Sequence, residues 1–261
     1  MGWGKWPVAL AAAVLFASAA SAARDATEAP DLRDGDWIKP ADILFIGDSE
    51  SLGYFGAQLY RSLATERDPR TGRALTVWSL WTCASDVTTW LRGGTSYCGI
   101  RTCNGAGECA RDHGPMDRPG RIRYAPLTTY LDKVSPRLTV VSLGTNLLSG
   151  RGAFSYDWYL ESAARLVRQI KNSGSACIWV GPPQVAEKTR TIADYERFSA
   201  DLANTVQKSG CAYIDSTRLS DRRYIVAADS EGIHYQPKGE KLWEAGVWTA
   251  LEPVLTARLT R

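Results

Sequence analysis

The run Ile43-Leu44-Phe45-Ile46-Gly47-Asp48-Ser49 decides the fold of this chain, because a short apolar strand in it passes directly into a polar turn. Four consecutive apolar residues are typical of a strand that is covered on both faces, as the strands of parallel sheets are. The turn places the hydroxyl of Ser49 where the strand opens into a helix, and the N–H groups at a helix start have no partner within the helix. Such a serine can combine a nucleophile with donors for a developing oxyanion. Ser49 is therefore the candidate nucleophile.

Short apolar runs recur along the chain, and the segments between them are long enough to carry crossover helices. Strands that alternate with helices form a parallel sheet with helices on both faces, and ligands bind beyond the carboxyl ends of its strands. We therefore expect an α/β fold, a three-layer α/β/α sandwich with a five-stranded parallel sheet. The expected strands are Ile43 to Gly47, Thr76 to Leu80, Leu138 to Leu143, Cys177 to Gly181 and Ala212 to Asp215. The spacing also predicts three long helices, from Tyr156 to the stop at Asn172-Ser173-Gly174, from Ile192 to Lys208, and from about Pro237 to Leu255.

Residues 92–126 interrupt this alternation. Glycine, proline and cysteine are frequent there, and no period of apolar residues is long enough to indicate a helix or a strand. The segment is predicted to be a long Cys/Gly-rich loop held by disulfides, and loops of this length often serve as lids or binding walls. His113 lies in this loop and is interpreted as a solvated histidine rather than a catalytic one.

The amino-terminal residues 1–22 have the organisation of a cleaved signal peptide. Lys5 precedes an apolar stretch from Val8 to Phe16, and small residues ending in Ala20-Ser21-Ala22 follow it. The stretch is too short to span a bilayer, and no later segment is apolar enough to do so. We therefore expect a secreted or periplasmic protein in which residues 23–261 form a single domain. The net charge of +3 is spread along the chain, which disfavours nucleic acid as a partner.

Six cysteines in an exported chain indicate disulfides. Cys177 and Cys211 each open an apolar run, so they are expected at matching ends of neighbouring parallel strands and favoured as a pair. For the other four, the first choice among the possible pairings is Cys83 with Cys98 and Cys103 with Cys109. A zinc site is disfavoured, because the cysteines lack the C-x₂-C spacing of structural zinc.

A serine nucleophile needs a base, and the chain has two histidines, of which His234 is the candidate. A carboxylate must hold the other nitrogen of this imidazole and support the imidazolium. Asn146 follows the apolar run that ends at Leu143, and its side-chain amide can donate to an oxyanion without transferring a proton. Ser49 and Asn146 are both expected at the carboxyl edge of the sheet.

Serine, glycine, asparagine and histidine in this order resemble the SGNH (GDSL-like) hydrolase family. The resemblance extends from Ile43 to the last helix, and Ser51 in place of a second glycine departs from the G-x-S-x-G elbow of ordinary α/β-hydrolases. It implies a flavodoxin-like sandwich and ester hydrolysis without a metal or another cofactor. The residue three before the histidine is usually aspartate in that family and is Glu231 here; spacing favours Glu231 as the partner of His234, with Asp229 as the alternative.

The family's second sequence block usually supplies a glycine N–H to the oxyanion hole, and this chain has no glycine at the expected turn after its second strand. Ala84 or Ser85 could present that N–H beside those of Ser49 and Asn146, provided that the backbone there does not require a positive φ.

These features together predict a secreted serine esterase that removes O-acetyl or other short acyl groups from a polysaccharide or cell-wall glycan. Trp81, Trp90, Tyr97 and Trp158 could stack on sugar rings, although packing is the commoner role of such residues. Two alternatives remain open. One is a non-catalytic carbohydrate-binding or cell-envelope protein on the same fold, and the other is an O-acyltransferase or lipase that uses the same triad.

Overall fold

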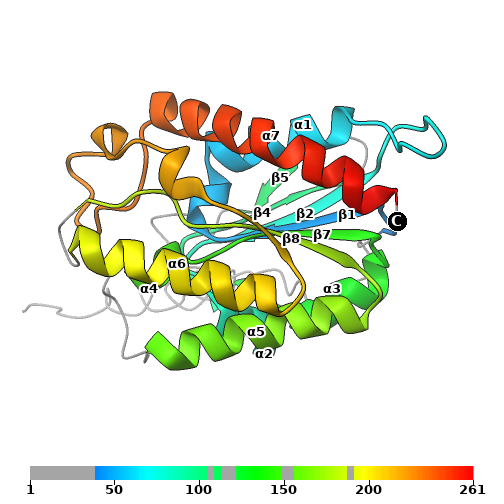
Figure 1. Cartoon of the computed structure of the whole chain (residues 1–261), viewed down its shortest axis with the longest axis horizontal. Coiled ribbons are helices and arrows are strands. Elements are labelled where there is room, and N and C mark those ends of the chain that lie inside the picture. Colours follow the sequence, from blue (N-terminus) through cyan, green and yellow to red (C-terminus); the bar gives the residue numbers. More distant parts are fainter. Residues whose placement is uncertain (1–38, 105–108, 113–121, 149–155, 187–190, 261) are drawn as a thin grey trace, which may run out of the picture.

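The computed structural model describes residues 39–104, 109–112, 122–148, 156–186 and 191–260 (Figure 1). Five strands form the parallel part of its main sheet, in the spatial order β2-β1-β7-β8-β9. Numbered along the chain among themselves, these strands follow the flavodoxin-like order 2-1-3-4-5, which confirms the predicted α/β sandwich. Their bounds are Ile43–Gly47 for β1, Val77–Thr82 for β2, Leu138–Ser142 for β7, Ala176–Val180 for β8 and Ala212–Ile214 for β9.

Helices cover both faces of the sheet, as Figure 1 shows. One layer holds α1 (Tyr54–Thr65) and α7 (Pro237–Leu259). The opposite layer holds α2 (Val87–Arg92), α3 (Leu127–Val134), α5 (Tyr156–Asn172) and α6 (Ile192–Lys208). The three long helices begin where the sequence predicted, and α7 continues beyond the expected end at Leu255.

Strand β1 divides its side chains between the two layers. Ile43 and Phe45 pack in the core under α1 and α7, whereas Leu44 and Ile46 pack in the core under α2, α3, α5 and α6. All four are fully buried. Side chains alternate across a strand, so a strand that is buried on both faces needs the continuous apolar run seen in the sequence.

The prediction of a loop at 92–126 was wrong for the described part of that segment. Two antiparallel strands extend the main sheet beyond β2, with β4 paired to β2 and β5 paired to β4, and β3 pairs with β6 in a second small sheet. These strands have only three or four residues each, too few to give a recognisable period. Their bounds are Gly94–Ser96 for β3, Ile100–Cys103 for β4, Cys109–Asp112 for β5 and Ile122–Tyr124 for β6.

The six cysteines form three disulfides, Cys83–Cys98, Cys103–Cys109 and Cys177–Cys211, the same pairs that the sequence analysis favoured. Cys103–Cys109 closes the β4–β5 hairpin, and Cys177–Cys211 joins the starts of β8 and β9. The expected signal peptide at 1–22 and His113 lie outside the described residues.

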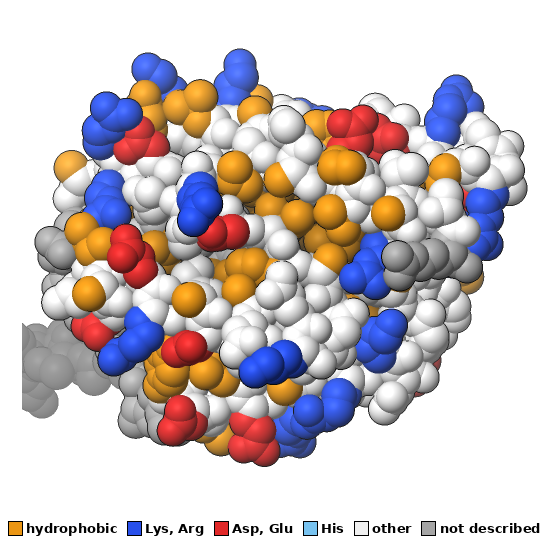
Figure 2. Space-filling model, viewed as in Figure 1, with side chains coloured by type: hydrophobic (Ala, Val, Ile, Leu, Met, Phe, Trp, Pro, Cys, Tyr) orange, Lys and Arg blue, Asp and Glu red, His pale blue; other side chains and the backbone are white. Residues whose placement is uncertain are grey.

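No helix in the described ranges has the length and apolar character required to cross a bilayer. On the face drawn in Figure 2, Lys and Arg side chains are spread among Asp and Glu side chains.

Gly47 ends β1 and permits a close approach of the turn that follows. A Cβ at this position would lie 2.7 Å from the Cβ of Ser51, closer still to its Oγ, and 3.1 Å from Cδ1 of Trp81. The side chains of Ser51 and Trp81 are fully buried and have little room to move. The absence of a side chain at residue 47 therefore allows the turn that carries Ser49 to fold back on the sheet.

We expect Gly47→Ala to lower the free energy of unfolding by about 1–3 kcal/mol, because it overpacks this contact. Adding Ser51→Gly should restore part of the loss, because it removes the side chain that the new methyl group meets. Urea denaturation of both variants measures the two changes. Equal stability of Gly47→Ala and the unchanged protein would contradict this explanation of the glycine.

Candidate active site

The candidate site lies at the carboxyl edge of the sheet, where the strand order reverses between β1 and β7. Ser49 begins the short 3₁₀ helix η2 (Ser49–Leu52) directly after β1, and Asn146 lies in the short helix α4 (Thr145–Leu148) after β7. Such a reversal opens a crevice beyond the strand ends, which is where ligands bind in open α/β sheets. The structure therefore places both side chains at the edge that the sequence predicted.

Asp48 holds the turn that presents Ser49. Its carboxylate is buried and accepts a hydrogen bond from the backbone N–H of Glu50 at 3.1 Å, which caps η2. Burial raises the pKa of Asp48 to about 7, although the backbone groups of Glu50 and Thr145 act in the opposite direction. The side chain of Ser49 is half-buried, and no residue in the described ranges hydrogen-bonds its hydroxyl.

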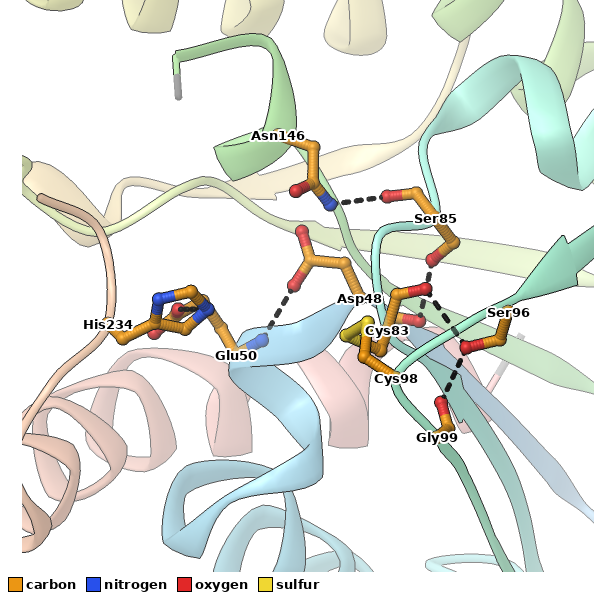
Figure 3. Close-up of a disulfide and its surroundings, with 10 residues drawn as sticks. Asp48, Glu50, Cys83, Ser85, Ser96, Cys98, Gly99, Asn146 and His234 are labelled. Atoms are coloured by element: carbon orange, nitrogen blue, oxygen red, sulfur yellow. Dashed lines mark hydrogen bonds and ion pairs between the residues drawn. A yellow bond between two sulfur atoms is a disulfide. The ribbon is translucent and has the colours of Figure 1, made fainter. Parts of the chain in front are cut away.

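Asn146 is positioned by a glycine turn and by a contact with the turn after β2. Gly144 has a φ of +138°, a conformation that side chains rarely adopt, and a Cβ there would meet the ring of Pro182 at 3.1 Å. The side-chain Nδ2 of Asn146 donates to the carbonyl oxygen of Ser85 at 2.6 Å (Figure 3). The amide is therefore fixed between the carboxyl ends of β7 and β2.

His234 is held by Asp229. The Oδ2 of Asp229 lies 3.2 Å from Nδ1 of the imidazole and also accepts the backbone N–H groups of Ile233 and His234 at 2.8 and 2.9 Å. Its Oδ1 accepts the N–H of Glu231 at 3.0 Å. Three backbone donors and the histidine lower the pKa of Asp229, against the effect of its partial burial, so this carboxylate stays ionised.

The preference for Glu231 as the partner of His234 was wrong by this geometry, and the alternative, Asp229, supplies the contact with Nδ1. Gly232 has a φ of +71° and bends the loop between the carboxylates and the histidine. This bend brings a residue five positions before His234 to the ring, which linear spacing does not reveal.

Glu50 is a buried carboxylate that the sequence analysis missed. Its side chain is 2 % exposed, and its Oε1 lies 3.8 Å from Nε2 of His234 with no hydrogen-bond partner among the described residues (Figure 3). Burial and the neighbouring carboxylates of Asp48, Glu240, Asp229 and Glu231 raise the pKa of Glu50 well above its usual range. The sequence offered one signal for Glu50, namely its position directly after Ser49. Its burial was not predictable, because an acid in a turn is usually exposed to solvent.

The turn after β2 takes an unusual conformation at Ala84. Its φ is +61°, so the expectation that the backbone here would not require a positive φ was wrong: Ala84 takes the left-handed conformation that a glycine would adopt at this turn. Ala84 is exposed, and no residue in the described part of the chain accepts its N–H. The N–H of Ser85 is engaged with the carbonyl of Thr82 at 3.2 Å, which removes Ser85 as a free donor.

No protein-family model matches the chain, and no curated protein matches its sequence. Solved structures do match its fold. A lipase/acylhydrolase from Enterococcus faecalis is 14 % identical and gives a TM-score of 0.52 over 81 % of this chain and 95 % of its own. TesA is 16 % identical and gives a TM-score of 0.52 over 81 % of this chain and 98 % of its own. A peptidoglycan O-acetylesterase is 13 % identical and gives a TM-score of 0.50 over 84 % of this chain and 92 % of its own.

The chain has the SGNH hydrolase fold. The identities are too low to carry an activity across, so the chemistry depends on the residues of this chain.

On this SGNH fold, two of the four candidate sugar-stacking aromatics are unavailable. Trp81 and Trp90 are fully buried, and they pack against Phe45, Tyr60, Tyr124 and Tyr130. Tyr97 is 56 % exposed, and Trp158 is half-buried with the guanidinium of Arg92 6.0 Å from its ring centroid. Tyr97 and Trp158 are thus the two of these four whose side chains are not fully buried. In the described ranges, no three His, Cys, Asp or Glu side chains are arranged to hold a metal ion.

The buried acids Asp48 and Glu50 should make the protein less stable as the pH rises. Both pKa values are raised on folding, so the folded state binds more protons than the unfolded chain once the pH exceeds their ordinary values of 3.8 and 4.5. Their contribution to stability is complete below those values and is lost as the pH rises through the raised ones. Asp229 has the opposite effect, and its contribution is lost in acid.

We therefore expect Glu50→Gln to be more stable than the unchanged protein at pH 8 and similar to it at pH 4. Urea denaturation at pH 4, 6 and 8 measures this difference. Glu252→Gln, at an exposed position on α7, is the control and should show no such trend. If the free energy of unfolding changed with pH in the same way for Glu50→Gln and the unchanged protein, burial of this acid would have no energetic cost.

Proposed function

We propose that this protein is a serine esterase in which Ser49 is the nucleophile and His234 is the general base. The observation that carries the proposal is the placement of the imidazole. Its Nδ1 faces Asp229 at 3.2 Å, and its Nε2 faces Glu50 in the first turn of η2, the turn that begins with Ser49. The ring thus has one nitrogen on an ionised carboxylate and the other toward the serine turn, as a catalytic base requires.

In this mechanism the Ser49 Oγ attacks the ester carbonyl while His234 Nε2 accepts its proton. The Ser49–His234 hydrogen bond forms as the substrate enters, since such contacts are often long before binding. Asp229 keeps the Nδ1 proton in place and stabilises the imidazolium. The imidazolium then protonates the departing alcohol, which leaves an acyl group on Ser49. A water molecule, deprotonated by His234, attacks this acyl-enzyme and releases the carboxylic acid.

The oxyanion of the tetrahedral intermediate would be held by three donors from three turns. These are the N–H of Ser49 at the start of η2, the N–H of Ala84 after β2, and Nδ2 of Asn146 after β7. The Asn146 amide already lies at the Ala84–Ser85 turn through its hydrogen bond to the Ser85 carbonyl. Fixed, uncharged donors stabilise charge as it develops without reorganising.

We further propose that the protein is exported and that its substrate is an O-acetylated glycan. The signal-peptide pattern in residues 1–22 and the three disulfides support export, because disulfides persist in oxidising compartments. A peptidoglycan O-acetylesterase is among the structures of the same fold, and the exposed ring of Tyr97 lies next to Cys98, whose disulfide partner adjoins the Ala84 turn.

Ser49→Ala should lower the turnover of a short-chain aryl acetate at least about 10³-fold, because no other group supplies the nucleophile. Ser51→Ala is the matched control, since Ser51 is a buried serine of the same 3₁₀ helix whose hydroxyl has no partner among the described residues. The control should keep most of the activity. Unchanged turnover in Ser49→Ala would eliminate the proposed nucleophile.

Asp229→Asn should lower kcat by about 10²–10⁴-fold, since the amide no longer stabilises the imidazolium or enforces the correct tautomer. Glu231→Gln, two residues away, should change kcat much less. Steady-state kinetics of the two variants, with thermal melts to check folding, separates these carboxylates. A larger loss in Glu231→Gln would reverse the assignment.

The substrate proposal predicts that the protein releases acetate from an acetylated polysaccharide faster than it hydrolyses a long-chain ester. It also predicts that Tyr97→Ala raises KM for the polysaccharide but leaves KM for the aryl acetate unchanged. Acetate assays and initial rates measure both effects. Hydrolysis of long-chain esters without any release of acetate would indicate a lipase instead.

A further inference from the structure

Ala84 has a conformation that its residue type does not favour. A φ of +61° puts the Cβ of an L-residue close to the neighbouring carbonyl oxygen, and glycine or asparagine usually takes such positions. Strained backbone of this kind persists only where the surrounding contacts fix it, and it is concentrated at functional sites. The contacts on each side of Ala84 therefore indicate what its conformation depends on.

On the amino-terminal side, Cys83 is held at three points. Its N–H donates to the carbonyl of Gly99 at 3.0 Å, its carbonyl oxygen lies 3.2 Å from the hydroxyl of Ser96, and its sulfur is bonded to Cys98. Ser96 is fully buried, and its single hydroxyl proton is shared between the carbonyls of Cys83 and Gly99, the latter at 2.8 Å. Figure 3 shows these residues gathered on one side of the site. The 96–99 segment thus acts as a clamp on Cys83.

On the carboxyl-terminal side, Ser85 is held just as closely. Its hydroxyl donates to the carbonyl of Gly47 at 3.3 Å and accepts the indole N–H of Trp90 at 3.3 Å, and its carbonyl accepts Asn146. Ala84 itself has no such contact among the described residues, and its N–H is left free. The strained residue is therefore fixed only through its two neighbours.

We propose that the Cys83–Cys98 disulfide and Ser96 are positioning elements for the oxyanion hole, which hold Ala84 in the left-handed conformation that aims its N–H at the substrate. This inference rests on the proposed esterase function. A glycine would take this conformation without help, whereas an alanine needs the clamp. Releasing the clamp lets Ala84 relax to negative φ and turns its N–H away from the oxyanion.

The proposal predicts a selective effect on the chemical step. A donor that acts on the developing oxyanion affects kcat more than KM. Cys83→Ala/Cys98→Ala should lower kcat by about 10- to 100-fold, with KM changed by less than about 3-fold. The matched control is Cys177→Ala/Cys211→Ala, which removes a disulfide between the starts of β8 and β9, at the opposite end of these strands from the site. The control should keep kcat within about 3-fold.

Adding Ala84→Gly to the Cys83→Ala/Cys98→Ala variant is the decisive step. If the disulfide positions the N–H, glycine should recover a large part of the lost kcat, since it adopts a positive φ without strain. If the disulfide only stabilises the fold, glycine should recover nothing, and the two disulfide variants should lose activity alike. Either an unchanged kcat in Cys83→Ala/Cys98→Ala or no recovery with Ala84→Gly would overturn the proposal. Ser96→Ala, which keeps all disulfides, should show a smaller loss of the same kind.

A measurement made in the absence of substrate tests the clamp independently of the proposed esterase function. Hydrogen exchange of the Ser85 amide, which donates to Thr82 across the Ala84 turn, should be faster in Cys83→Ala/Cys98→Ala and unchanged in the Cys177→Ala/Cys211→Ala control. Equal exchange in the two would refute the clamp even in an active enzyme. Absence of turnover in the unchanged protein would instead refute the esterase proposal, and the exchange rates would still decide whether the clamp holds the turn.

Discussion

The shared register of three parallel strands is the constraint on which the candidate site depends. Gly47 at the end of β1 pairs with Trp81 of β2 and with Ser142 of β7, so the turns after these strands begin at nearly the same height. Ser49, Ala84 and Asn146 come from those turns. The strands are continuous apolar runs buried on both faces, and this burial fixes their register. The register of the strands therefore brings together groups that are far apart in sequence, and contacts between their side chains are not needed to do so.

The second feature of the site is a single histidine among buried or half-buried carboxylates. Asp229 stays ionised because three backbone N–H groups stabilise its charge, whereas Glu50 has no such donors in the part of the chain that the structure describes, and its pKa is raised. The two acids thus differ in how readily they carry a charge beside the two nitrogens of His234. The raised pKa of Glu50 disfavours a negative charge next to Nε2. The environments of the acids, rather than their number, decide how the imidazole can act.

The sequence predicted the strands and long helices well, because each strand of the parallel sheet is a short apolar run and each helix has clear end signals. It missed the strands between residues 92 and 126, which are too short for a period. It favoured Glu231 over Asp229, because spacing along the chain does not reveal the bend at Gly232. The conformation of Ala84 was also not predictable, since alanine rarely adopts a positive φ and tertiary contacts of its neighbours impose it here.

The central claim is that Ser49 is an activated nucleophile, and covalent labelling tests it most directly. A fluorophosphonate reacts only with a serine whose proton a nearby base can take, and the site of the adduct can be read by peptide mass spectrometry. We predict one adduct, on Ser49, that forms far more slowly in His234→Ala. A folded protein that remains unlabelled, or that carries the adduct on another serine, would contradict the account.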